Sequence, residues 1–185
     1  MAATRAEEEP MDEPRTTARE RADVQDDDGL LAFWQAAQGH LGFGRLGVVV
    51  GEQSDDVVVP PAWTFGVTAE EADAEVEAVL AGRKTATSGP RAAFADLPEV
   101  GDVGIVLDGA HRPRALVRVT AVDVVPGSLV STGHAGAELG VAPSEDALER
   151  WRALNAGVSG EVADEVVVER FEVVYPTDGP APAVD

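Results

Sequence analysis

Hydrophobic residues follow two different spacings along this chain. Alternation with polar residues, or a short run of aromatic and β-branched residues, predicts strands at 63–66, 84–88, 103–107, 114–125 and 165–175. An apolar residue at every third or fourth position predicts amphipathic helices at 29–40, 69–81 and 144–155. Asp108-Gly109 lies between two predicted strands and indicates a hairpin. The pattern therefore predicts one α+β domain with a mostly antiparallel, β-rich core.

Capping residues set the limits of the second predicted helix. Thr68 and Glu71 have the spacing of a capping box, in which each side chain bonds the backbone of the other residue. Gly82 stands where a left-handed residue would end the helix. The third helix is expected to end near Asn155, and residues 127–142 before it form a polar loop or a short helix. The buried face predicted for the third helix is Ala147, Leu148, Trp151 and Leu154.

The ends of the chain lack the composition of a folded core. Residues 1–28 hold ten acidic and four basic residues and almost no large apolar side chain, so we expect a disordered acidic tail. Asp28 is a candidate N-cap for the helix at 29–40. Residues 29–62 are expected to form this helix and a connecting arm, and residues 177–185 a second disordered tail.

The charge of the chain limits its partners. The net charge is −20, and residues 63–176 alone hold nineteen acidic and nine basic residues. Proteins that bind long nucleic acids usually present a basic face, so a long duplex is excluded and any contact with nucleic acid must be local. The candidate cations for such contacts form two groups, which are Arg83, Lys84 and Arg91, and Arg112, Arg114 and Arg118.

The composition also predicts several absences. The chain has no cysteine, which excludes disulfides, thiolate metal ligands and a thiol nucleophile. His40, His111 and His134 lack the close spacing of metal ligands, so we name no metal-ligating residue and expect no cofactor. Magnesium bound by carboxylates stays open as an alternative. No apolar run reaches the length of about 18 residues that a membrane helix needs, and no secretion signal is visible, so cytoplasmic location is the default expectation. No oligomeric state is predicted.

Lys84 is the only lysine, whereas arginine occurs thirteen times. A lysine ammonium is compact and can lose its proton, which a guanidinium cannot. In a strand at 84–88, alternation places Lys84 and Ser88 on one side and Thr85 and Thr87 on the other. A bend or bulge would be needed for Lys84 and Thr87 to reach one pocket. Lys84 therefore keeps two candidate roles, as a proton acceptor or as a fixed cation for a phosphate or carboxylate.

Four segments in this order and spacing resemble the ASCH-domain family. They are Trp63-Thr64-Phe65-Gly66, the helix end that runs through Gly82-Arg83-Lys84-Thr85-Ala86-Thr87, Val100-Gly101-Asp102 before a strand, and the last strand up to Pro176. The resemblance covers residues 63–176. Phe33-Trp34-Gln35 is also similar to the amino-terminal helix of longer family members. The resemblance implies a PUA-like β-barrel with flanking helices.

The resemblance also implies a function. The family includes small bacterial enzymes that deacylate N4-acetylcytidine, and other proteins of this size that are described as ribonucleases. In the amidohydrolase branch the working residues are a Lys-x-x-Thr pair and a later glutamate. The pattern falls on Lys84, Thr87 and Glu138, the implied catalytic residues. The substrate-binding residues expected around them are Arg83, Thr85, Ser88, Arg91 and His134.

These residues allow more than one chemistry. A threonine hydroxyl attacks only when a base takes its proton, and Lys84 can be that base only in its neutral form. Glu138 could orient Lys84, accept a hydrogen bond from a cytosine amine or carry a proton to the leaving group. A carboxylate near Lys84 favours the charged ammonium, so these roles compete. The expected ligand is a nucleoside or a short single-stranded RNA, and the alternative to a hydrolase is a non-catalytic module that binds RNA or a modified base.

Overall fold

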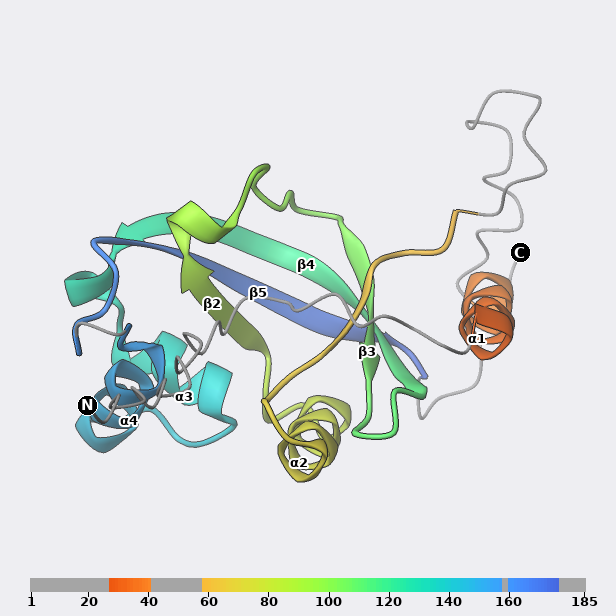
Figure 1. Ribbon diagram of the computed structural model, residues 1–185, viewed down its shortest axis with the longest axis horizontal. Coiled ribbons are helices and arrows are strands. Elements are labelled where there is room, and N and C mark those ends of the chain that lie inside the picture. The colour runs from red at the N-terminus through yellow and green to blue at the C-terminus, as the bar shows by residue number, and fades with distance from the viewer. Residues whose placement is uncertain (1–26, 41–57, 158–159, 177–185) are drawn as a thin grey trace, which may run out of the picture.

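The computed structural model describes residues 27–40, 58–157 and 160–176 (Figure 1). The predicted tail at 1–28, except its last two residues, lies outside this part of the chain. The same holds for most of the predicted connecting arm, at 41–57, and for the tail at 177–185.

A curled five-stranded sheet forms the centre of the fold (Figure 1). Its strand order is β1-β3-β4-β5-β2. All neighbours are antiparallel except β1 and β3. The strands are β1 (Ala62–Thr64), β2 (Ala86–Pro90), β3 (Val103–Leu107), β4 (Pro113–Pro126) and β5 (Glu165–Tyr175). The α+β prediction and the PUA-like, mostly antiparallel architecture are confirmed, in the form of a half-barrel whose end strands are β1 and β2.

Within the described residues, four helices and two short 3₁₀ turns flank the sheet. Helix α1 (Asp27–His40) lies at one end, and α2 (Ala69–Leu80), α3 (Thr132–Leu139) and α4 (Glu145–Asn155) lie along the sheet below it in Figure 1. The 3₁₀ turns are Arg91–Ala93 and Gly127–Leu129. Helices α1 and α2 each contribute to one apolar cluster with the sheet, and α3 and α4 share a third. No helix among these described residues has the length and hydropathy to cross a membrane.

Local capping chemistry explains how α2 begins and ends. The Thr68 side chain accepts from the Glu71 amide, and the Glu71 carboxylate accepts from the Thr68 amide at 3.0 Å, as the capping box predicts. After the helix, Gly82 has a φ of +66°, which glycine adopts without steric cost. The chain therefore turns sharply just before Lys84.

Three local predictions need correction. Strand β2 begins at Ala86 rather than at residue 84, because the Lys84 amide still donates to the carbonyl of Ala78 at the end of α2. Leu154 lies in the last turn of α4 and is 52% exposed, so the buried face of this helix consists of Ala147, Leu148 and Trp151. Helix α1 begins at Asp27, so Asp28 lies inside the helix and is not its cap.

The segment between β4 and α4 contains a defined helix. The sequence allows a polar loop or a short helix here, and the structure has a helix, α3. Its N-cap is Ser131, whose side chain accepts from the His134 amide at 3.1 Å. Gly140 ends the helix with a φ of +67°. The face of α3 that turns inward carries His134 and Glu138 one turn apart.

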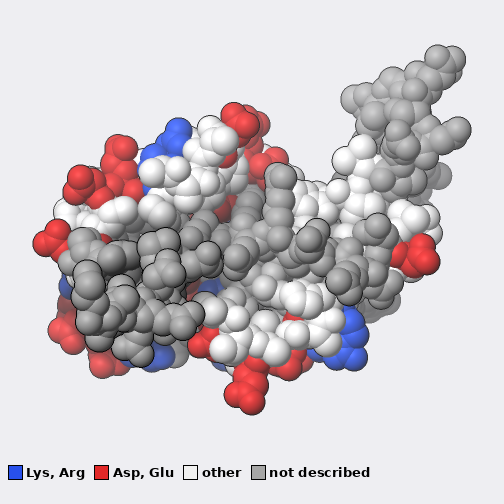
Figure 2. All heavy atoms as spheres, viewed as in Figure 1, with Lys and Arg blue, Asp and Glu red and all other residues white. Residues whose placement is uncertain are grey.

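The acidic composition is visible on the surface (Figure 2). Acidic side chains are spread around the described part of the face shown, and Lys and Arg appear only in small separate groups. This part of the face carries no continuous basic stripe of the kind that follows a nucleic-acid backbone.

Gly104 provides a test of the core packing. A Cβ at this position of β3 would overlap the six-membered ring of Trp63, which is buried and cannot move away. We expect Gly104→Ala to lower the free energy of unfolding by about 2–3 kcal/mol, measured by urea denaturation. Gly39→Ala is the control, because a Cβ there meets nothing within 4 Å, and its effect should be neutral or slightly stabilising. Equal stability of the two variants would contradict the packing of Trp63 on β3.

Candidate functional site

Lys84 is buried with its charge. Its side chain leaves the turn after α2, and the residue is only 5% exposed. The ammonium donates to the backbone carbonyl of Glu138 at 2.7 Å and pairs with the Glu75 carboxylate at 3.0 Å. It also lies 4.6 Å from the ring centroid of Phe65, within the range of a cation–π contact. These partners compensate a charge that would otherwise be costly to bury.

Backbone contacts fix the position of Lys84. The amides of Arg83 and Lys84 both donate to the carbonyl of Ala78, at 2.9 and 3.1 Å. The Thr85 amide then donates to the carbonyl of Ala137 in α3 at 3.0 Å. The two residues between Gly82 and β2 therefore connect α2 to α3, and this connection directs the lysine side chain between the two helices.

A second buried charge lies next to the first. Glu138 is 7% exposed, and one of its oxygens, Oε2, meets three polar groups. Ser88 Oγ donates at 2.6 Å, Trp151 Nε1 donates at 2.8 Å, and His134 Nε2 lies at 3.1 Å. Trp151 Nε1 also lies 3.1 Å from Ser88 Oγ. These four residues form a network that joins β2, α3 and α4.

The network keeps Glu138 ionised. Burial raises the pKa of the Glu138 carboxyl, but the hydrogen bond from His134, the positive charge of Lys84 and the hydrogen bond from Ser88 outweigh burial. The resulting pKa lies below the ordinary value of 4.5. Because an ionised carboxylate only accepts hydrogen bonds, His134 meets it with a protonated Nε2.

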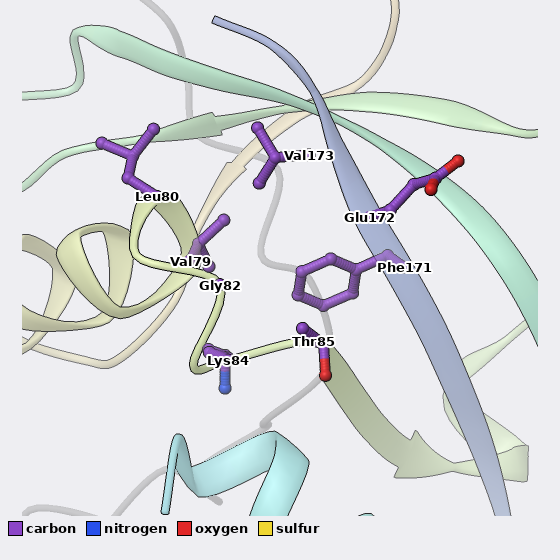
Figure 3. A pocket seen from close by; sticks show the side chains of 8 residues that line it. All are labelled: Val79, Leu80, Gly82, Lys84, Thr85, Phe171, Glu172 and Val173. Atoms are coloured by element: carbon purple, nitrogen blue, oxygen red, sulfur yellow. The ribbon is translucent and has the colours of Figure 1, made fainter. Parts of the chain in front are cut away.

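A pocket of about 280 Å³ lies beside Lys84 (Figure 3). It is formed by the end of α2, the turn that follows and β5, and its lining residues are Val79, Leu80, Gly82, Lys84, Thr85, Phe171, Glu172 and Val173. Figure 3 shows the Lys84 nitrogen directed away from Phe171 and toward the neighbouring helix. The pocket is mostly apolar with a few polar groups, as is common for small-molecule sites.

Thr87 takes a different position from the other two implied catalytic residues. It is 6% exposed in β2, opposite Glu169 of β5. Its side chain points away from that of Ser88, because neighbours in a strand alternate, and its hydroxyl has no hydrogen bond to a described residue. The structure thus brings Lys84, Ser88 and Glu138 into contact and leaves Thr87 on the other face of β2.

The remaining expected binding residues are spread around the site. His134 belongs to the Glu138 network, and Thr85 lines the pocket. Arg83 is exposed outside the pocket lining. Arg91 lies in the 3₁₀ turn after β2 and donates to the carbonyl of Phe94 at 2.7 Å. Among the described residues, no group of three or more His, Asp or Glu side chains could hold a metal ion.

Three partners in this site are not among the site residues expected from the sequence. Trp151 was expected only on an apolar face, although its indole donates to Glu138, and Phe65 lies against the Lys84 ammonium. The third is Glu75, which pairs with Lys84. Its spacing carried a signal, because it lies three residues after buried Ala72 and four before buried Val79, which places it at the edge of the inward face.

Comparison with known proteins bears out the resemblance. The family model described as ASCH domain matches residues 61–175. The crystal structure of protein EF3133 from Enterococcus faecalis V583, assigned to family DUF984, has a TM-score of 0.62 and 25% identity, over 79% of this chain and 88% of that chain. The crystal structure of an ASCH domain from Lactobacillus crispatus JV V101 has a TM-score of 0.54 and 22% identity, over 77% and 96% of the two chains. The comparison with curated proteins gives no match.

The lowered pKa of Glu138 predicts a pH-dependent stability. A carboxyl whose pKa is lower in the folded state stabilises the fold above its unfolded pKa, and this contribution is lost as the pH falls through the folded pKa. At pH 7 we expect Glu138→Gln to be less stable than wild type by about 2 kcal/mol. The difference should shrink as the pH falls below 4.5, measured by urea denaturation across pH. Exposed Glu149→Gln is the control. A difference that stays constant with pH would contradict the buried carboxylate.

Proposed function

Since this chain belongs to the ASCH-domain family, we propose that it binds a nucleobase-containing ligand beside Lys84 and hydrolyses it. The proposed substrate is an N4-acylated cytidine or a short single-stranded RNA. One observation carries the proposal. A buried ammonium and a buried carboxylate, on Lys84 and Glu138, lie in adjoining networks next to a pocket. Buried charges with specific partners in a concave site are typical of functional sites.

The net chemistry of the proposed amidohydrolase reaction is simple. Water adds across the bond between the acyl carbon and N4, which gives cytidine and a carboxylate. In the two-step form, the Thr87 hydroxyl attacks the acyl carbon, the C–N bond breaks and the amine leaves with a proton. Water then hydrolyses the threonine ester. In the ribonuclease form of the proposal, water hydrolyses a phosphodiester instead.

The contacts of Lys84 support a role as a cation. Both of its oxygen partners, the Glu138 carbonyl and the Glu75 carboxylate, accept hydrogen bonds, which suits a protonated ammonium. A fixed ammonium can stabilise the negative charge that develops on the acyl oxygen in the transition state. A role as a base would require Lys84 to lose its proton first, against these two acceptors.

A second candidate function is supported by the position of Thr87. Its side chain lies on the face of β2 opposite to Ser88, which belongs to the Glu138 network. A module that binds RNA or a modified base without catalysis would use the pocket and Lys84 and would need no nucleophile. In both candidates the acidity of the chain favours a nucleoside or a short strand over a long duplex.

Four variants separate these candidates in one assay. Wild type, Lys84→Ala, Thr87→Ala and Lys84→Arg are tested for turnover of N4-acetylcytidine and of a labelled single-stranded RNA. We expect Lys84→Ala and Thr87→Ala to lose about 10²–10³-fold in kcat/KM, the effect of removing one group that stabilises the transition state. Lys84→Arg should retain part of the activity, because it keeps the charge.

Thr120→Ala is the matched control, because Thr120 is an exposed strand threonine that belongs neither to the pocket lining nor to the Glu138 network. It should leave turnover unchanged. Binding of cytidine derivatives with no turnover of either substrate would favour the non-catalytic module. If wild type neither binds nor converts any of these ligands, the proposed function is wrong.

A further inference from the structure

We infer that Glu75 determines which ligands reach Lys84, by keeping phosphate-bearing ligands away and admitting uncharged ones. The inference rests on the proposed function, in which the pocket beside Lys84 takes a nucleobase-containing ligand. It narrows that function to a nucleoside and makes Glu75 the specificity-determining residue.

Glu75 is the more exposed of the two oxygen partners of the Lys84 ammonium. The Lys84 side chain is 6% exposed, whereas the Glu75 side chain is 34% exposed at a distance of 3.0 Å. The other oxygen partner, the Glu138 carbonyl, belongs to a buried residue of α3. The Glu75 carboxylate is therefore the oxygen partner of Lys84 that solvent and ligands can reach.

The cation that lines the pocket is already paired with a carboxylate. Lys84 is the single cation that lines the pocket among the described residues, and it is paired with Glu75. The pocket also has the acid Glu172 on its wall, paired with Arg118, and the ionised Glu138 lies close behind Lys84. A phosphate placed beside Lys84 would therefore compete with Glu75 for the ammonium and would be repelled by the carboxylates of Glu75 and Glu138.

The position of Glu75 is fixed by the helix that carries it. Helix α2 begins at a capping box, and Val76 and Val79 are fully buried against the sheet. The buried positions of these two valines set the direction of the Glu75 side chain, because Glu75 lies next to Val76 and one turn before Val79. Its carboxylate is thus held over Lys84 before any ligand binds.

The single lysine makes a direct test possible. Protein prepared with isotope-labelled lysine gives NMR signals from the Lys84 side chain alone, because the chain has no other lysine. The probes are cytidine, cytidine 5′-monophosphate and inorganic phosphate, added to wild type, Glu75→Gln and Glu149→Gln. Glu149 lies exposed on α4 and has no ion pair with Lys84, so its variant removes the same charge elsewhere.

We expect cytidine to shift the Lys84 signals of wild type and both variants with similar affinity. Phosphate and the monophosphate should bind Glu75→Gln at least about tenfold more tightly than wild type or Glu149→Gln. The inference would be overturned if Glu75→Gln and Glu149→Gln gained the same affinity for phosphate. It would also be overturned if wild type bound phosphate as tightly as Glu75→Gln does. If cytidine binds to none of the proteins but Glu75→Gln gains phosphate, the role of Glu75 holds and the proposed function fails.

Discussion

The buried ammonium of Lys84 is the interaction on which the arrangement of this site depends. A charge in that position requires acceptors, and they come from two helices, the Glu75 carboxylate of α2 and the Glu138 carbonyl of α3. The residue after Lys84 continues the connection, because the Thr85 amide donates to Ala137 of α3. Lys84 therefore holds together elements that are more than fifty residues apart in the sequence.

The Glu138 network extends this connection to the third helix of the site. Its carboxylate accepts from Ser88 of β2 and from Trp151 of α4, and it contacts His134 one turn earlier in α3. A hydrogen-bonded network of this kind restricts the geometry of its members. The Glu138 carboxylate, whose backbone carbonyl binds Lys84, is consequently held in place before any ligand arrives.

Most of the fold follows from short-range patterns in the sequence. The capping box at Thr68 and Glu71 and the last strand at 165–175 were predictable because local hydrogen bonding and alternation determine them. The start of β2 was not predictable, because the amides of the two residues before it bond elsewhere, Lys84 to Ala78 of α2 and Thr85 to Ala137 of α3. That Lys84 lies near Glu138 was indicated only by the family resemblance. Their link through a backbone carbonyl, and the second contact with Glu75, depend on how α2 and α3 pack and were not predictable from spacing.

The central claim is that a nucleobase-containing ligand occupies the pocket beside Lys84. The most direct test is the rate at which an amine-reactive reagent modifies Lys84, followed by mass spectrometry with and without saturating N4-acetylcytidine. The chain has one lysine, so its modification is distinguished from that of the N-terminal amine. The account predicts that the nucleoside slows modification of Lys84 and leaves the N-terminal amine unchanged. An unchanged rate at Lys84 would contradict it.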